Sequence, residues 1–295
     1  MLPTCSFRYD SVVTLAAERA VYHQHPVEVL EPDAVADLPE ADTLLVQVTS
    51  QALFEQAHIP GAVLIEPAAL VCGIPPSPGK LPALQQLQST LADAGYHPEQ
   101  KVIAFDDEGG GWAGRLFWTL DVLGHYDWAY LDGGLHAWHA AGLPLAQGPA
   151  STTANDNLQL RIDSAPIAEL ADVHAAIADP RCIIWDVRSA EEYAGLRSGS
   201  ARHGHIPGAV NLDWELLKDG ERQLRLVENL EAVAGSLGLL DADRVITHCQ
   251  THHRSGLSYL VGRLLGLNIQ AFHGSWAEWG NDPNTPIDNP CAATS

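Results

Sequence analysis

The sequence is poor in positive charge. Its 295 residues include 16 lysines and arginines against 37 aspartates and glutamates, so the formal net charge is −21. Binding to nucleic-acid phosphates or to an anionic membrane surface requires clustered basic side chains. The composition therefore argues against both kinds of partner, and an anionic substrate must be attracted by a local site rather than by the field of the whole protein.

Long apolar runs and paired cysteines are also missing. No apolar stretch reaches the roughly 18 residues that a membrane-spanning helix needs, and charges interrupt the N-terminal segment where a secretory signal would lie. The five cysteines are scattered and form no Cys-x-x-Cys pair, which argues against a disulfide framework or a zinc cluster. We expect a cytoplasmic protein in a reducing compartment, with no metal and no cofactor.

The chain does contain one internal repeat. The pentapeptide His-Ile-Pro-Gly-Ala at 58–62 recurs at 205–209, and the segment 101–106 aligns with 244–249. The order of the matching segments is the same in both copies, and the offset between them shrinks slowly along the chain. This pattern indicates a duplicated domain with small insertions rather than a short solenoid repeat.

The repeat and a polar linker divide the chain into predicted segments. Two domains of this size can bury their own cores, so we expect a monomer. The predicted segments are an N-terminal extension at 1–26, a first domain at 27–146, a linker at 147–163, a second domain at 164–287 and a tail at 288–295.

Strand and helix patterns alternate in each half. In the second half, 182–187 and 244–248 are short apolar runs of strand length. Ser189 with Glu192 forms a capping-box pattern that starts a helix, and 257–265 is apolar at near-helical spacing. Continuous apolar strands that alternate with helices predict an α/β fold, with a parallel sheet flanked by helices in each half.

One loop carries a nucleophile. Cys249 follows the predicted strand 244–248 and precedes the predicted helix 257–265, which places it at the carboxyl end of a parallel strand, where open α/β sheets bind ligands. Backbone N–H groups of such a loop converge with the positive end of the following helix. Arg254 adds a fixed positive charge to the same place.

These surroundings favour the thiolate form of Cys249. A helix N-terminus and nearby cations lower the pKa of a cysteine, and the thiolate is the nucleophile. We therefore interpret Cys249 as catalytic rather than as a buried structural thiol. His252 and His253 either add positive charge when protonated or are partly exposed loop residues.

The loop resembles that of a known enzyme family. The run Cys-Gln-Thr-His-His-Arg-Ser-Gly at 249–256 is similar to the active loop of a bacterial subgroup of two-domain rhodaneses, which are thiosulfate sulfurtransferases. The His-Ile-Pro-Gly-Ala motif in both halves and the segment Gly-Ser-Trp-Ala-Glu-Trp at 274–279 also resemble this family. The resemblance covers residues 27–287 and implies two tandem rhodanese-like domains.

The resemblance also implies a mechanism. Cys249 is expected to take the outer sulfur of thiosulfate as a persulfide and to pass it to cyanide or a thiol acceptor in a ping-pong cycle. Arg188 matches an arginine that meets the substrate sulfonate in the family, although an ion pair with Asp186 or Glu192 is an equal alternative. The other residues expected to bind substrate are Gln250, Thr251, His252, His253, Arg254, Ser255 and Gly256.

Several alternatives remain open at this point. Thr251 stands where many rhodaneses have a basic residue, which leaves the physiological donor open. A 3-mercaptopyruvate donor ranks lower because its branch has a Cys-Gly-Ser-Gly type of loop. The persulfide could instead be delivered to a partner protein, in which case the chain is a sulfur carrier. A phosphatase is disfavoured because Cys249 and Arg254 are separated by four residues rather than five.

The first half is expected to be inactive. Asp106 stands at the position of Cys249, and Asp107 and Glu108 follow it. A carboxylate cannot carry sulfane sulfur, and three acids repel an anionic donor. We expect a structural role, with Trp112 and Arg115 facing the second half; a metal site at the three acids is an unfavoured alternative.

Overall fold

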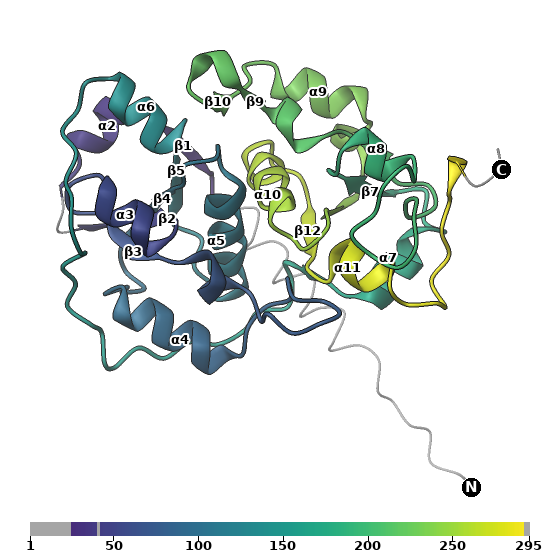
Figure 1. The fold of residues 1–295 in the computed structure, drawn as a ribbon, viewed down its shortest axis with the longest axis horizontal. Coiled ribbons are helices and arrows are strands. Elements are labelled where there is room, and N and C mark those ends of the chain that lie inside the picture. Colours follow the sequence, from purple (N-terminus) through teal and green to yellow (C-terminus); the bar gives the residue numbers. More distant parts are fainter. Residues whose placement is uncertain (1–24, 40–41, 292–295) are drawn as a thin grey trace, which may run out of the picture.

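The structure is a computed structural model that describes residues 25–39 and 42–291 (Figure 1). The predicted N-terminal extension up to residue 24 and the tail residues 292–295 lie outside the described residues. Two α/β lobes lie side by side, and α5 (Gly111–Val122) and α10 (Arg254–Leu264) meet between them. Each lobe corresponds to one copy of the sequence repeat.

The first lobe contains a parallel five-stranded sheet in the order β1-β5-β4-β2-β3. Its strands are β1 (Glu28–Leu30), β2 (Thr43–Val48), β3 (Val63–Ile65), β4 (Lys101–Phe105) and β5 (Trp128–Leu131). Besides α5, its helices are α2 (Pro32–Ala36), α3 (Gln51–Gln56), α4 (Leu84–Asp93), α6 (Gly134–Ala140) and the 3-10 helix η2 (Pro67–Leu70).

The second lobe repeats this topology with the order β6-β12-β11-β7-β8, again all parallel. Its strands are β6 (Ile167–Ala168), β7 (Cys182–Asp186), β8 (Val210–Asn211), β11 (Arg244–His248) and β12 (Ile269–Phe272). Its helices are α7 (Leu170–Ala176), α8 (Ala190–Tyr193), α9 (Leu230–Ser236), α10 and α11 (Ser275–Trp279). An insertion between β8 and α9 contains η3 (Trp214–Leu217), β9 (Lys218–Asp219), η4 (Gly220–Arg222) and β10 (Arg225–Leu226), and η5 (Leu239–Asp241) follows α9.

The predicted α/β fold is confirmed, and the reason is visible in the central strands. Four of the five residues of β11 are buried, as are four of the five in β7, because helices cover both faces of the sheet. The capping box predicted at Ser189 and Glu192 starts α8, with both of its hydrogen bonds present. None of the helices in the described part of the chain is long and apolar enough to cross a bilayer.

The two His-Ile-Pro-Gly-Ala copies have a structural role. His58 is buried, bonds through Nδ1 to the Phe54 carbonyl at 2.9 Å and stacks on the Phe54 ring. His205 does the same with Tyr193, with a hydrogen bond of 2.8 Å. The histidine of the motif therefore fixes a loop in each lobe by bonding to a backbone carbonyl.

The two lobes are joined where α5 packs against α10. A Cβ atom on Gly114 would lie 2.1 Å from the Gly256 carbonyl oxygen, so the two helix backbones touch where these glycines meet. Further along, the buried Asp121 carboxylate of α5 accepts hydrogen bonds from Tyr259 and Arg263 of α10. The hydrophobic core is continuous across this interface, which therefore belongs to the interior of one folded unit.

Candidate active site

Cys249 directly follows β11, the central strand of the second sheet, and a loop of four residues separates it from α10. Its side chain is almost fully buried, with 1% of the residue exposed. The Ser255 hydroxyl donates to Cys249 Sγ at 3.5 Å, and the Cys249 N–H donates to Ser275 Oγ at 3.4 Å. Trp276 N–H donates to the Cys249 carbonyl at 3.0 Å. The thiol therefore sits at a fixed position where the loop meets the first turn of the helix.

The environment of Cys249 favours its thiolate. Burial is the largest effect and opposes ionisation, but the charge of Arg254, the hydrogen bonds from Ser255 and the charge of His253 together lower the pKa of the thiol. Cys182 is a useful comparison, because burial raises the pKa of that thiol. Of these two buried cysteines, only Cys249 is placed to react as an anion.

Arg254 does not face the site as a free cation. Its two terminal nitrogens donate to the Glu192 carboxylate at 2.7 and 3.0 Å, a bidentate pair. Glu192 is itself held in the capping box of α8. The positive charge near Cys249 that Arg254 provides is therefore shared with a carboxylate, and its orientation is fixed by that pair.

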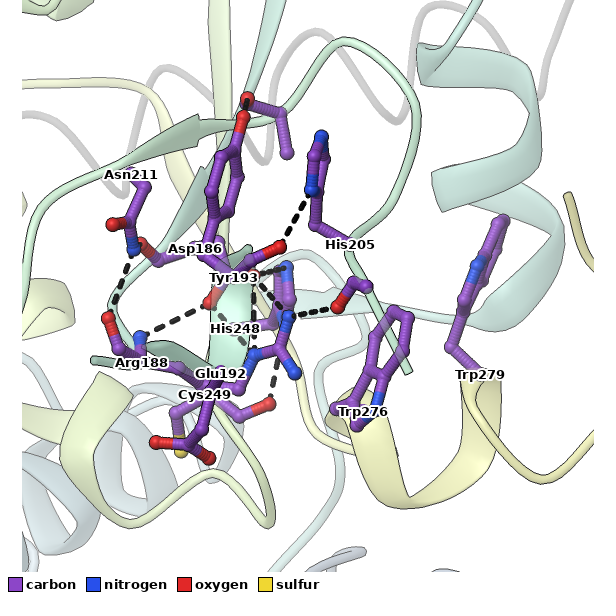
Figure 2. Close-up of polar contacts among 12 residues, drawn as sticks. Asp186, Arg188, Glu192, Tyr193, His205, Asn211, His248, Cys249, Trp276 and Trp279 are labelled. Carbon is purple, nitrogen blue, oxygen red and sulfur yellow. Dashed lines mark hydrogen bonds and ion pairs between the residues drawn. The ribbon is translucent and has the colours of Figure 1, made fainter. Parts of the chain in front are cut away.

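Arg188 forms the ion pair that the sequence left as an alternative. Figure 2 shows its guanidinium beside Asp186 and Trp276. Both members of the pair are fully buried; Nη2 lies 2.5 Å from Asp186 Oδ2, and Nε donates to Oδ1 at 3.0 Å. The guanidinium carbon lies 4.2 Å from the centre of the Trp276 ring. The Arg188 guanidinium is therefore held by Asp186 and by the Gly204 carbonyl, to which Nη2 donates at 2.9 Å.

The loop histidines occupy two different environments. His252 is fully buried with φ at 55°, and its Nδ1 lies 2.8 Å from Ser255 Oγ. Burial holds the pKa of His252 well below its usual range, so the ring is neutral and positions Ser255. His253 is about a quarter exposed, at the interface with the first lobe.

His253 makes its contacts with the first lobe. Its Nε2 bonds to the Glu108 carboxylate, and its ring stacks on Trp112 with a centroid distance of 4.4 Å. Trp112 therefore faces the second half, as predicted. Glu108 is a site residue that sequence reasoning missed as a partner of the loop, since nothing in its local pattern indicates a contact with residue 253.

The remaining predicted loop residues anchor the loop and set its approach to the first lobe. The Gln250 side chain points to Ser200, with its Nε2 donating to the hydroxyl at 3.1 Å. Thr251 has its carbonyl against Gly79 of the first lobe, where a Cβ atom would lie 1.9 Å away. Gly256 allows the close approach of α5. The side chain of Gln250 is thus a loop anchor, and Thr251 and Gly256 fix how the loop meets the first lobe.

The corresponding loop of the first lobe shows what this geometry can hold. Asp106 is 1% exposed, and its carboxylate accepts five backbone N–H bonds of 2.8 to 3.1 Å. The donors belong to Glu108, Gly109, Gly110, Trp112 and Ala113. Burial and the nearby Glu108 raise the pKa of Asp106, while these donors lower it. The strand–loop–helix turn is therefore an anion cradle, filled here by its own side chain.

The three acids of this loop have separate partners. Asp106 binds its own loop, Asp107 accepts from the Thr49 hydroxyl at 3.5 Å, and Glu108 bonds to His253. The carboxylates do not converge on one point, so their arrangement does not support the metal site weighed as an alternative.

Replacing Asp106 with alanine is expected to destabilise the protein strongly. The substitution removes the acceptor of five N–H groups, and a buried donor without a partner costs about 1–3 kcal/mol. We expect the free energy of unfolding to fall by roughly 3 kcal/mol or more, measured by urea denaturation. Asp107→Ala is the matched control and should change it by less than about 0.5 kcal/mol; equal effects of the two variants would contradict the cradle.

Known proteins resemble this chain along most of its length. The rhodanese-like domain model matches residues 31–141 and 169–282. A protein of Pseudomonas aeruginosa named thiosulfate sulfurtransferase is 39% identical over 270 residues, which is 91% of this chain and 99% of that protein. A protein of the same name from Azotobacter vinelandii is 41% identical over 262 residues, 88% of this chain and 96% of that one.

Solved structures share the fold at lower identity. The anaerobic ergothioneine biosynthesis enzyme from Chlorobium limicola superposes with a TM-score of 0.78 and 20% identity, over 89% of this chain and 70% of that one. The crystal structure of YnjE gives a TM-score of 0.79 and 21% identity, over 89% and 68%. At this identity the likeness concerns the arrangement of the two lobes alone.

Proposed function

This chain belongs to the rhodanese family, and we propose that it transfers sulfane sulfur from thiosulfate to cyanide or a thiol acceptor through a persulfide on Cys249. Sulfur transfer is supported by relatives at 39% and 41% identity that are named thiosulfate sulfurtransferase. The donor and the acceptor are small molecules in this proposal, and the monomeric state and cytoplasmic location stay predictions.

The proposed reaction has two steps. The Cys249 thiolate attacks the outer sulfur of thiosulfate, a new S–S bond forms, and the old S–S bond breaks with its electron pair leaving on sulfite. The enzyme then holds a persulfide anion. Cyanide attacks the terminal sulfur, which leaves as thiocyanate and returns the electron pair to Cys249 as a thiolate. No net oxidant or proton is needed in either step.

The comparison of the two equivalent loops, one in each lobe, is the observation that carries the proposal. In the first lobe the loop binds a buried anion, the Asp106 carboxylate, through five N–H groups. In the second lobe the same position holds Cys249, whose pKa is lowered. A thiolate that gains a sulfur atom stays an anion, now as a persulfide, and hydrogen-bond donors such as those of Ser255 stabilise such charge. Only the second lobe combines the loop with a nucleophile.

The burial of Cys249 favours small reactants over a protein acceptor. With 1% of the residue exposed, the sulfur is reached by small anions more readily than by a cysteine on a folded partner. The role of a sulfur carrier therefore ranks second. The spacing of four residues between Cys249 and Arg254 still disfavours a phosphatase, and Thr251 leaves the physiological donor, including 3-mercaptopyruvate, for experiment.

Treatment with thiosulfate tests the proposal directly. The intact protein should gain the mass of one sulfur atom, and peptide mapping should place it on Cys249. Cyanide should remove the added mass and release thiocyanate. A Cys249→Ala variant should gain nothing. Wild-type protein that takes up no sulfur from thiosulfate would rule out thiosulfate as the donor, and sulfur on another cysteine would overturn the assignment of the nucleophile.

A further inference from the structure

A fully buried arginine from the first lobe reaches the active loop of the second. Arg115 lies in α5, is 0% exposed and donates through Nη1 to the carbonyl of His252 at 3.3 Å. The same nitrogen donates to the Gly79 carbonyl at 2.7 Å. Arg115 thus connects α5, the segment around Gly79 and the backbone of the loop that carries Cys249.

All its hydrogen bonds go to carbonyl oxygens. Nη2 donates to the carbonyls of Leu70 at 2.6 Å and Lys80 at 3.5 Å, and the guanidinium carbon lies 4.6 Å from the centre of the Trp118 ring. No carboxylate in the part of the chain that the structure describes forms an ion pair with Arg115, and its Nε has no partner there. Burying a charge without a counter-ion destabilises a fold, so a functional role for this arginine is worth testing.

The other arginines near the site are neutralised. Arg254 is paired with Glu192, and Arg188 is paired with Asp186. Arg254 still has the largest favourable charge effect on the Cys249 thiol, and a cation without a carboxylate partner would add to that effect. Arg115 is therefore a buried cation near the loop whose charge no carboxylate offsets.

Arg115 is linked to the Cys249 sulfur through the loop: it donates to the His252 carbonyl, and the His252 ring bonds to the Ser255 hydroxyl that donates to Cys249 Sγ. Burial lowers the pKa of Arg115 to about 9, while the charges of Cys249 and Cys72 act in the opposite direction. The group keeps its charge at neutral pH. By reciprocity, a cation that is stabilised by the Cys249 thiolate stabilises that thiolate.

We propose that Arg115 is a positioning residue of the active site: it holds the active loop through the His252 carbonyl, and its uncompensated charge stabilises the anionic sulfur of Cys249. The first lobe thereby contributes a functional group to the chemistry of the second. The role in turnover depends on the proposed sulfur transfer, whereas the effect on the thiol can be measured without any sulfur donor.

Other titratable groups also interact with Cys249 and Arg115. Those that interact with Cys249 are Arg254, His253 and the adjacent His248; those that interact with Arg115 are Cys249, Cys72, His252 and His273. Burial holds the pKa of His252 well below its usual range and lowers that of His273 to about 4. Both rings are neutral near pH 7, so neither changes the charge that Arg115 presents.

The test measures how fast iodoacetamide alkylates Cys249 at different pH values. The full-length protein is used, and the modified Cys249 peptide is quantified by mass spectrometry. Thiolate is the reactive form, so the rate rises with pH through the pKa of Cys249. Arg115→Met keeps an unbranched, apolar side chain, shorter than that of arginine, and removes the charge. In this variant we expect the midpoint of the alkylation profile to move to higher pH by about one unit. At pH values below the midpoint, the alkylation rate should then be roughly tenfold lower than in the wild type. Arg115→Lys should stay close to wild type, because it restores the charge.

Arg263→Met is the matched control, because it weakens the interface between the lobes without removing Arg115. Arg263 is a buried arginine in the last turn of α10 that bonds to Asp121 across the same interface, at the end of the helix opposite to the loop. This variant should lose stability and keep the alkylation midpoint. If Arg115→Met does not fold, Arg115→Gln replaces it, because its amide still donates a hydrogen bond but carries no charge.

The outcomes separate this proposal from the assignment of sulfur transfer. An unchanged midpoint in the neutral variants would overturn the role of Arg115, as would an equal shift in Arg115→Lys and Arg115→Met, which would indicate packing rather than charge. Wild-type protein that alkylates with the expected profile but takes up no sulfur from thiosulfate would contradict only the proposed donor.

Discussion

Replacing Cys249 with serine is expected to abolish the formation of thiocyanate from thiosulfate and cyanide. A serine hydroxyl stays protonated at neutral pH and cannot form a persulfide, so the covalent step has no substitute. We expect turnover to fall by at least roughly 10³-fold, as when other enzymes lose their nucleophile. The assay is the colorimetric detection of thiocyanate at saturating thiosulfate.

Cys182→Ser is the matched control for this variant. Cys182 is also a buried cysteine, at the start of β7, and its sulfur accepts a bond from Arg244 Nε at 3.3 Å. Because burial raises the pKa of its thiol, we expect Cys182 to take no part in turnover. Thiocyanate formation that survives in Cys249→Ser, or that is lost equally in Cys182→Ser, would refute Cys249 as the carrier of sulfur.

A single methyl group at Gly114 is expected to disrupt the joint between the two lobes. The Cβ atom of an alanine at this position would lie 2.1 Å from the Gly256 carbonyl oxygen and 2.3 Å from its carbonyl carbon. These are backbone atoms of α10, so the helices must move apart instead of a side chain turning away. We expect a loss of about 3 kcal/mol in the free energy of unfolding, at the upper end of overpacking effects.

The same substitution should also lower activity, because Gly256 immediately follows the loop residues Arg254 and Ser255. Moving α5 away from α10 withdraws Arg115 from the His252 carbonyl. Urea denaturation and thiocyanate assays on the same preparation measure both effects.

Gly235→Ala is the matched control, a helical glycine at which alanine is expected to stabilise the protein. Gly235 lies in α9, and a Cβ atom there would meet only a Leu240 methyl group at 3.6 Å, an ordinary contact. Alanine is a better helix former than glycine, so this variant should gain roughly 0.5–1 kcal/mol. A Gly114→Ala protein as stable as Gly235→Ala would contradict the close backbone approach.

The sequence alone was enough for the fold and for proposing Cys249 as the nucleophile. The strands β7 and β11 are continuous apolar segments, and their residues are buried on both faces because helices cover the sheet. Such patterns are local, so they are readable without knowing what packs against them. The duplication, the parallel sheets and the position of Cys249 after a central strand all follow from local patterns of this kind.

Only the tertiary structure decided which charges are paired at the site. The sequence left Arg188 between a substrate and a carboxylate, and it offered both Asp186 and Glu192 as partners. In the folded chain Asp186 pairs with Arg188 and Glu192 pairs with Arg254, because α8 brings Glu192 against the start of α10. Residues that are 62 positions apart in the chain, as Glu192 and Arg254 are, leave no local trace of their contact.

The contribution of the first lobe to the site was equally hidden. Sequence reasoning placed Arg115 and Trp112 at an interface, but it could not place the Arg115 guanidinium on the His252 carbonyl or Glu108 on His253, contacts across 137 and 145 residues. Local periodicity determines which segments fold into strands and helices. How two finished lobes pack determines which side chains surround Cys249, because that packing depends on the shape of both surfaces together.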